Sequence, residues 1–562
     1  MSYALSSGVT GLKAHQEMLD VAGNNLANVN TTAFKASRVG FAELLSQTME
    51  QAAQPTGNLG GTNPQQMGSG VGVSSITPSM GQGSIVNTGN PLDVALEGQG
   101  YFVVSDGDRE LYTRAGAFGV DASGDLTVDP ATGYHVQRIG LTGESDGFQI
   151  PGDSNIRIPY GVALPAKTTT QVTLTGNLSS DAAGTPRAQV LTSSTTYTVD
   201  GSEAGGTAQI DQLDQFSGGS GAGGELGVGE TGTITISGFD RDGTALSTGL
   251  TFTVTAATTA DDLIDHLNNN VLTDATASFA NGQIRITDDE TGYSKSDIKL
   301  TYSGTGELTT PAYFDVTTVG GDEVKNVNIA VYDSQGGKHV LSAALVRTDT
   351  VNTWDAILTS ITGNVQAIEP GNRRVSGLAF NPQSGAFSGI PDTESGEFTV
   401  TFAHDAGHPQ VLSLNLGTTD SFDGLTQFAG NSTAVAREQN GYEAGNLSAV
   451  SVSGDGTLVG TFTNGAKKDL ARLQIALFNN PAALESAGGG YFIASANSGT
   501  AVATQATSTG AGVIHGGALE KSNVDVATEF VSMIEAQNGY QANARTIRVA
   551  NDILQQLTNL IR

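Results

Sequence analysis

Residues 24–37 read NNLANVNTTAFKAS and follow a stretch with helical periodicity close to the start of the chain. The segment holds four asparagines and three serine or threonine residues, and only Leu26, Val29 and Phe34 could anchor a core. Chain ends are normally the least ordered and most tolerant parts of a domain. A stretch so polar and specific near an end therefore needs a partner to explain it.

Apolar side chains recur every seven residues on both sides of a proline-containing middle. All 15 prolines lie between Pro55 and Pro481, so both ends can form unbroken helices. Seven-residue spacing places side chains along one helix face, as in a coiled-coil seam. The seams that we expect to be self-assembly surfaces of two inner helices are Leu5, Leu12, Leu19 and Leu26 near the start, and Met533, Tyr540, Ile547, Leu554 and Ile561 near the end.

The second helix is predicted to begin near Ser522 and Asn523, an N-cap pair with Asp525 and Glu529 in the first turns. An amphipathic helix packed on its own domain is the alternative for either seam. Two such seams at opposite ends of one chain favour the coiled-coil interpretation.

The composition predicts several domains with a mainly β middle. A chain of 562 residues exceeds the roughly 250–300 residues at which single cores stop growing. Short β-branched runs such as GTITISGF and TFTVTAAT are bounded by Asp-Gly, Asn-Gly and Gly-Gly turns, which is hairpin chemistry. The predicted fold class is therefore α+β multidomain, with terminal α-helical coiled-coil segments flanking nested, mainly-β outer domains.

The charge distribution limits the partners. The net charge is −30, which disfavours nucleic acid, and residues 1–45 and 519–562 carry 0 and −1 of it. No run of 18 apolar residues exists, so no membrane insertion is expected. The first residues lack the basic and apolar regions of a secretory signal peptide.

No catalytic constellation is predicted, and we expect neither an enzyme nor a cofactor or metal site. With no cysteines, thiolate chemistry is excluded. Gly219, Gly221 and Gly224 fit G-x-G-x-x-G, but neither a strand before them nor a helix after them is predicted. His404 and His408 stand four apart, but the neighbouring glycine and proline argue for a loop.

The polar stretch resembles the N-terminal signature of the flagellar rod and hook family. Its matching positions are Asn24, Asn25, Ala27, Asn28, Asn30, Thr31, Phe34 and Lys35. Ala33 stands where that family usually has glycine, the residue that most readily adopts left-handed backbone. The stretch LEKSNVDVATEFVSMIEAQNGYQANARTI resembles the C-terminal signature, and its matches include Ser522, Asn523, Asp525, Met533, Gln537, Tyr540 and Asn543.

The middle of the chain resembles the hook branch of this family, in stretches such as VYDSQGGKHVL, while residues 187–311 match only loosely. The resemblance implies an inner helical coiled-coil domain of residues 1–30 with 523–562, a linking segment of 31–71 with 505–522, a first β domain of 72–178 with 432–504, a second β domain of 179–186 with 312–431, and an inserted outer module of 187–311.

The resemblance implies a structural subunit of the bacterial flagellar hook, which self-assembles into a curved, flexible helical tube and transmits torque from rod to filament. The implied partners are other copies of the chain, the rod, hook cap and hook–filament junction proteins, and the flagellar type III export apparatus. The implied location is extracellular, reached without a cleaved signal. The asparagine-rich stretch would then bond neighbouring subunits.

Two alternatives remain open at this point. A distal rod subunit of the same family shares both end motifs, although the length of the chain favours the hook. A secreted β-rich adhesin, carbohydrate-binding protein or carbohydrate-active enzyme with coiled-coil ends would belong to another class. It would need convergent acids or aromatic side chains, and Trp354 is the only tryptophan that could stack on a sugar.

Overall fold

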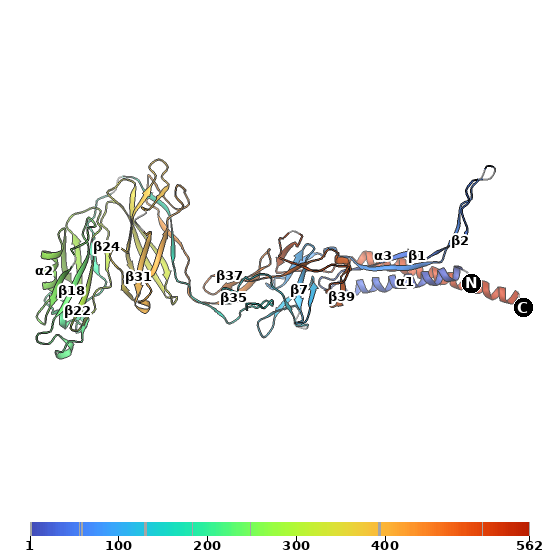
Figure 1. Ribbon diagram of the computed structural model, residues 1–562, viewed down its shortest axis with the longest axis horizontal. Helices are drawn as coiled ribbons and strands as arrows, with labels where there is room; N and C mark the ends of the chain where they lie inside the picture. Colours follow the sequence, from blue (N-terminus) through green and yellow to red (C-terminus); the bar gives the residue numbers. More distant parts are fainter. Residues whose placement is uncertain are drawn as a thin grey trace. The chain divides into compact units, whose positions relative to one another are not determined.

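The computed structural model describes residues 3–55, 57, 60–128, 132–181, 184–247, 249–391, 395–508 and 510–560; Ile561 lies outside them. The chain forms two compact units, Met1–Leu164 with Asn446–Arg562 and Pro165–Gly445. In Figure 1 the first unit contains both ends of the chain, drawn blue and red. No helix in the described ranges is long and apolar enough to cross a membrane.

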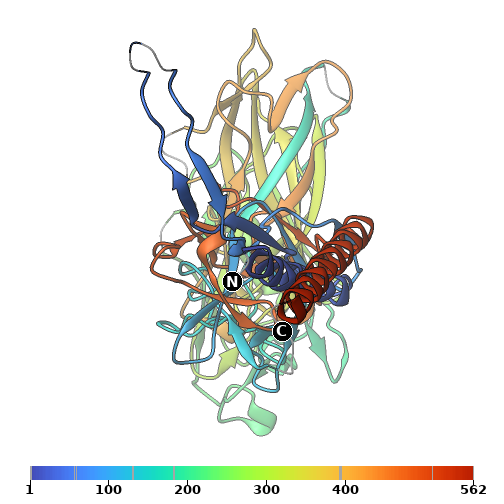
Figure 2. The same ribbon diagram turned by 90° about the vertical axis from the view of Figure 1, so that its right-hand side faces the viewer.

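Two long helices occupy the chain ends, as the heptad spacing predicts. Helix α1 spans Tyr3–Ala27 and α3 spans Val526–Leu560. They lie side by side in both views (Figures 1 and 2). They run antiparallel, since Gly8 lies against Ile547 while Asn25 reaches Glu529. Both ends therefore belong to one structural element.

The start predicted for the second helix was wrong by a few residues. Asp525, rather than Ser522 or Asn523, caps α3: its carboxylate accepts from the Ala527 N–H (3.1 Å) and the Thr528 hydroxyl (2.7 Å). Those hydrogen bonds hold the pKa of Asp525 below its usual range. All three residue types are good N-caps, and the side chain of Asn523 is engaged elsewhere.

A β-sheet lies along α1. Strands β1 (Ser37–Glu43) and β4 (Val71–Pro78) pair antiparallel, and both contact α1. Between them the chain forms a second antiparallel pair, β2 (Ser46–Glu50) and β3 (Gln65–Gly68), whose residues are almost all exposed. This β2–β3 hairpin has no further strand beside it in the described residues.

The β part of the first unit consists of short strands from both halves of the chain. The largest sheet has the order β39 (Glu485–Gly488), β40 (Tyr491–Ile493), β8 (Glu110–Thr113), β7 (Tyr101–Ser105), β11 (Tyr134–Val136), β10 (Leu126–Val128) and β9 (Phe118–Val120), with β38 (Ile475–Leu477) on β7 and β41 (Val502–Thr504) on β38. The others are β12 (Ala163–Leu164), β35 (Gly445–Val452), β36 (Thr457–Phe462) and β37 (Lys467–Arg472), then β42 (Val513–Gly516) with β6 (Val94–Glu97), and β43 (Ala518–Glu520) with β5 (Ile85–Asn87).

The second unit contains two larger sheets around one apolar core. One sheet has the order β28 (Val365–Ala367), β31 (Glu397–Phe402), β32 (Gln410–Asn415), β13 (Gln171–Ser179) and β33 (Leu425–Phe428), with β34 (Val435–Gln439) on β13. The other has the order β25 (Val324–Tyr332), β26 (Lys338–Arg347), β27 (Thr353–Ile361), β29 (Arg374–Phe380) and β30 (Phe387–Gly389). Trp354 is fully buried in this core, so it cannot stack on a sugar.

Residues 187–311, within the second unit, form further sheets, and β24 from just beyond this range completes one of them. These are β20 (Ala275–Ala280), β21 (Gln283–Asp288), β14 (Val190–Ser193) and β24 (Phe314–Thr318); β19 (Leu250–Val254), β18 (Gly232–Phe239) and β22 (Asp297–Gly304); and the pairs β15 (Thr198–Val199) with β16 (Ser202–Glu203) and β17 (Phe216–Ser217) with β23 (Glu307–Leu308). Helix α2 (Ala260–His266) has a capping box from Thr259 and Asp262. The core of these sheets includes Ala344, Val346 and Ile357 of β26 and β27, so it is continuous with the sheet that contains those two strands.

The two units divide the chain differently from the predicted β domains. Residues 165–178 and 432–445 belong to the second unit, because β13 pairs with β32, β33 and β34. The finer five-part organisation stays a prediction.

Candidate functional site at the paired chain ends

Small residues bring the two terminal helices close together. A Cβ added to Gly11 would lie 2.8 Å from the amide of Asn543, and one added to Gly539 would lie 2.4 Å from the ring of His15. Ala14, Ala22 and Ala536 are also buried. The contact between α1 and α3 is therefore a close approach of backbones, and larger side chains would separate the helices.

The predicted heptad residues lie mainly beside this contact. Leu5, Leu12, Leu19, Leu26, Met533 and Ile547 are half-buried, and Tyr540 and Leu554 are exposed. Ile547 does reach α1, where it packs against Gly8. From Asn551 to Asn559 every residue of α3 is exposed. The folded subunit thus leaves most of its apolar helix surface available to other molecules.

Asn25 joins α1 to both neighbouring elements. Its side chain is buried; the amide N–H donates to Glu529 Oε1 (3.0 Å) on α3 and to the Ser37 carbonyl (2.8 Å) at the start of β1. Its carbonyl oxygen accepts from the Ser37 N–H (2.9 Å). These hydrogen bonds of Asn25 are made within the chain, and the expected bonding of the asparagine-rich stretch to neighbouring subunits stays a prediction.

Three buried charges connect the two motifs to the first β-sheets. Lys35 Nζ lies 2.7 Å from Glu520 Oε1, and these side chains are 2% and 0% exposed. Arg114 Nη1 lies 3.8 Å from Glu520 Oε2, which is within ion-pair range but beyond hydrogen-bond distance. Glu520 Oε1 also accepts from the Gly83 N–H (2.7 Å). We call Lys35, Glu520 and Arg114 the charge cluster.

Burial and charge act in opposite directions on this cluster. Burial lowers the pKa of Lys35, and the hydrogen bond and negative charge of Glu520 oppose that shift. A buried ion pair is weak evidence of stability in itself, but removing one partner leaves an uncompensated charge. The cluster therefore makes the structure of the two motifs interdependent.

Asn523 performs a similar connecting role from the C-terminal motif. Its oxygen accepts from the Ala36 N–H (2.8 Å), and its amide donates to the carbonyls of Ser79 (2.8 Å) and Gly81 (3.1 Å). Ser522 accepts locally from the Val524 N–H. Together with Asn25, Asn523 explains the polarity of the motifs: backbone groups of the linking segment need side-chain partners.

The remaining motif residues are more exposed. Asn24 and Asn28 bond to each other at the end of α1, and Thr31 donates to Asn28 Oδ1 (3.0 Å). Phe34 is half-buried, and its carbonyl accepts from the Asn523 N–H. Ala27, Asn30 and Gln537 are exposed, and the amide of Asn543 donates to the Gly539 carbonyl (2.9 Å).

Ala33 adopts the left-handed backbone that its glycine-like position requires. Its φ is 57°, its side chain is buried, and its N–H donates to the Glu520 carbonyl (2.9 Å). A left-handed alanine costs roughly 1–2 kcal/mol, whereas glycine costs roughly 0.5–1 kcal/mol in lost chain entropy. The backbone of Ala33 is therefore strained, and contacts with the rest of the folded chain keep it in this conformation.

Ala33→Gly should accordingly stabilise the first unit by up to about 1 kcal/mol. The measurement is the free energy of unfolding by urea. Ala36→Gly is the matched control, since Ala36 is half-buried and has no positive φ. It should destabilise the unit, and equal effects of the two substitutions would contradict the strain argument.

Arg114 is a residue of this site that the sequence analysis did not select, and Glu520 was matched only as part of the C-terminal motif. Glu520 stands inside the C-terminal motif, and Arg114 lies just after β8. Lys35 was the one sequence signal that could have predicted this cluster. It lies between small and aromatic residues, and a lysine that is buried there needs a carboxylate as its partner. The sequence does not say which of its 56 acidic residues supplies it.

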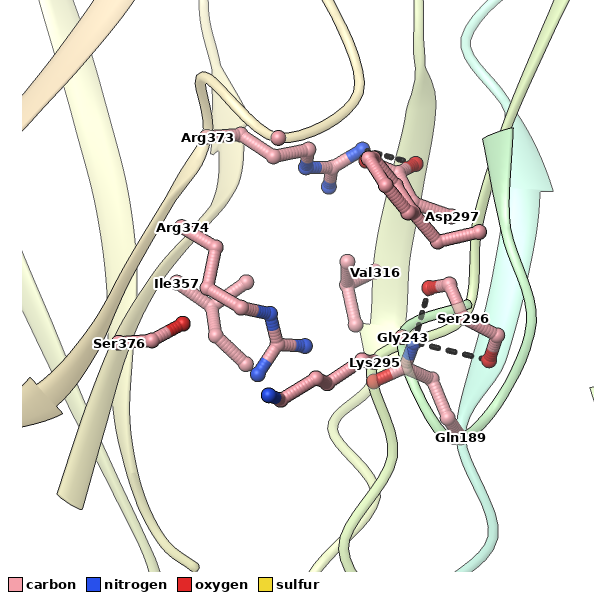
Figure 3. A pocket seen from close by; sticks show the side chains of 12 residues that line it. Gln189, Gly243, Lys295, Ser296, Asp297, Val316, Ile357, Arg373, Arg374 and Ser376 are labelled. Atoms are coloured by element: carbon pink, nitrogen blue, oxygen red, sulfur yellow. Dashed lines mark hydrogen bonds and ion pairs between the residues drawn. The ribbon is translucent and has the colours of Figure 1, made fainter. Parts of the chain in front are cut away.

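A cavity in the second unit was the other candidate for a functional site. It measures about 200 Å³ and lies between residues 187–311 and the β27–β29 strands. Figure 3 shows Lys295 and Arg374 reaching into the same space. Arg373 binds Asp297 (3.2 Å) and Arg374 binds Asp355 (3.0 Å), so both guanidinium groups have carboxylate partners. The described residues that line it include no histidine or cysteine, and the Arg373–Asp297 pair joins the inserted sheets to the start of β29.

One group of potential metal ligands occurs among the described residues. Asp121, Asp125 and His135 each offer an atom within 4.8 Å of the others. The Asp121 carboxylate already accepts from the Ser123 and Asp125 N–H groups, as in a turn. His404 and His408, spaced four apart, bind Asp333 and Asp405 respectively.

Comparison with known families places the chain in a class. Its terminal regions match the flagella basal body rod protein family over residues 5–35 and the C-terminal family of the basal body rod FlgEFG proteins over 515–560. Residues 95–180 match the D1 domain of flagellar hook proteins FlgE/F/G, and 301–442 match the flagellar basal body protein FlaE D2 domain. Paired terminal helices around such domains define the axial proteins of the flagellum.

Full-length relatives narrow the class to one family. The chain is 30% identical over 567 residues to the flagellar hook protein FlgE of Borreliella burgdorferi and 31% over 570 residues to that of Treponema pallidum, with all of each chain covered. Identity to the Escherichia coli FlgE is 26%, over 99% of this chain and all of that one. The crystal structure of Helicobacter pylori FlgE2 aligns at 16% identity and a TM-score of 0.36, over 72% of this chain and 93% of that one. The chain belongs to the flagellar hook protein FlgE family.

Proposed function

We propose that this chain is the structural subunit of a bacterial flagellar hook and polymerises through its paired ends into a curved, flexible tube. The observation that supports this most is the free apolar surface of the terminal helices, where α3 continues past the start of α1 with every residue from 551 to 559 exposed. When two unlike surfaces of neighbouring subunits bind each other, the contact repeats from subunit to subunit and generates an open helical polymer. Such a tube would carry torque from rod to filament.

The proposed function also includes binding partners and a route of export from the cell. The rod, the hook cap and the hook–filament junction proteins would contact the two ends of the tube, and the flagellar type III apparatus would export the subunit without a cleaved signal. The acidic middle, which carries −29 of the net charge of −30 in residues 46–518, would face water and keep outer contacts between subunits weak.

Electron microscopy tests the proposal. Cells that express this chain in place of their own hook protein should carry short curved tubes between rod and filament, labelled by an antibody against residues 187–311. A distal rod subunit would label a straight segment below the hook, and an adhesin would label no tube. Either of those results would overturn the proposal.

A further inference from the structure

Two apolar surfaces of the first unit are uncovered in the folded chain. The first, which we call the hairpin patch, lies on and beside the β2–β3 hairpin and consists of Leu44, Leu45, Met49 and Met67. Leu45 is 87% exposed and Met49 is 68% exposed. A two-stranded hairpin without a packing partner is marginally stable in water. An ordered hairpin with this composition therefore needs a surface to cover it.

The second surface lies on the last turns of α3. Val549, Ile553 and Leu557 are exposed and follow one another at four-residue spacing, so they form one row on the helix. Arg545 is exposed and occupies the preceding position of the same row. We call Arg545, Val549, Ile553 and Leu557 the α3 row. Helix ends without tertiary contacts gain little stability from propensity alone.

The two surfaces are complementary in charge as well as in hydrophobicity. The hairpin patch is flanked by Glu43 and Glu50, whereas the exposed charges on and beside the α3 row are Arg545, Arg548 and Asp552, a net charge of +1. Opposite charges around an apolar centre fix orientation and register in protein interfaces. Both surfaces are exposed in the folded chain, so they are accessible to another molecule.

We propose that the hairpin patch of one subunit docks on the α3 row of a second copy of this chain. The contact joins unlike surfaces, so it repeats from subunit to subunit and does not close on itself. It is continuous with the terminal helices, because β1 and β4, which carry the hairpin, pack on α1. This inference rests on the proposed function as a polymer and names the partner surface within it.

Cysteine pairs test the contact directly, because the chain has no cysteine of its own. One preparation carries Met49→Cys and the other carries Ile553→Cys; they are mixed, polymerised and oxidised mildly. A disulfide forms only when the two Cα atoms come within roughly 7 Å. We expect a band of twice the subunit mass in the mixed tubes, and none in mixed monomers. Met67→Cys with Leu557→Cys provides a second pair.

The control replaces the hairpin cysteine with Leu141→Cys, at a position that is 76% exposed in the first unit and outside the patch. It should give no cross-linked band with Ile553→Cys. Tubes without a cross-link in either pair would overturn the inference and leave the proposed function standing. Cross-linking of Ile553→Cys only with itself would replace it with a contact between two α3 helices. If the unmodified chain forms no tubes, the proposed function itself fails.

A charge exchange provides a test without cysteines. Glu50→Arg should raise the concentration needed for polymerisation by about tenfold, since like charges then face each other across the contact. Combining it with Arg545→Glu should restore the original value. If the double variant polymerises no better than Glu50→Arg alone, the two residues are not partners and the docking is wrong.

Discussion

Leu554→Asp should abolish tube formation while leaving the folded subunit intact. Leu554 lies on the part of α3 that extends beyond α1, and it is already exposed, so the monomer loses no internal contact. In the polymer a buried carboxylate without a partner costs several kcal/mol. Since about 1.4 kcal/mol corresponds to a tenfold change in an equilibrium constant, the critical concentration should rise at least about a hundredfold.

Light scattering and electron microscopy measure the loss of tubes, and circular dichroism checks the monomer. Gln555→Asp is the matched control: it adds the same charge at the neighbouring exposed position, which points away from both Leu554 and the α3 row. Ile547→Asp provides a contrast, because Ile547 packs against Gly8 and its replacement should also loosen the helix pair in the monomer. Normal tubes from Leu554→Asp would show that this face of α3 stays outside the assembly contacts.

Glu520→Gln should destabilise the first unit by about 3–5 kcal/mol, the usual cost of breaking a buried ion pair from one side. The substitution keeps the size of the side chain but leaves Lys35 and Arg114 buried without a counter-charge. Denaturant unfolding measures the loss. Hydrogen exchange should locate it at the amides of Ala33 and Gly83, which donate to Glu520 in the native chain.

The loss should depend on pH in a defined direction. Burial already lowers the pKa of Lys35, and removing Glu520 removes the group that opposes this shift. The unfolded chain then binds the lysine proton more tightly than the folded chain, so stability rises with pH. The defect of Glu520→Gln should therefore be largest near neutral pH and shrink as the pH approaches the ordinary range of lysine.

Two variants control for this effect. Lys35→Met combined with Glu520→Gln removes one stranded charge and should recover a large part of the loss. Glu97→Gln changes an exposed carboxylate of the same unit and should have little effect on stability. A change below about 1 kcal/mol for Glu520→Gln would contradict the importance of the charge cluster.

The existence of the terminal helices could be predicted from the sequence, and their contact surface could not. Heptad spacing is visible in hydropathy, so α1 and α3 were predicted at the right ends of the chain, apart from the first residues of α3. The actual contact uses Gly8, Gly11 and Gly539, and glycines carry no apolar signal. The leucine seam lies mainly on the helix surface that this contact does not use. Its role in assembly stays a prediction.

The motifs were recognised, but their internal chemistry was not. Ser522, Asn523 and Asp525 are all good N-cap residues, and local preference alone does not decide among them. Tertiary contacts decide which residue is the N-cap, since the amide of Asn523 donates hydrogen bonds to the carbonyls of Ser79 and Gly81 instead. Lys35 finds Glu520 at a separation of 485 residues, a pairing that no local pattern encodes.

That separation along the chain also determines when the subunit can finish folding. Lys35 leaves the ribosome early, whereas Glu520 and α3 emerge only when synthesis is almost finished. Contacts between distant residues carry a loop-closure cost and form late in folding. The second unit can fold without these late residues, but α1, the linking segment and the sheets of the first unit, which pair β5–β8 with β38–β43, must wait for the last part of the chain. A subunit that is still being made therefore lacks the paired ends through which we propose that it polymerises.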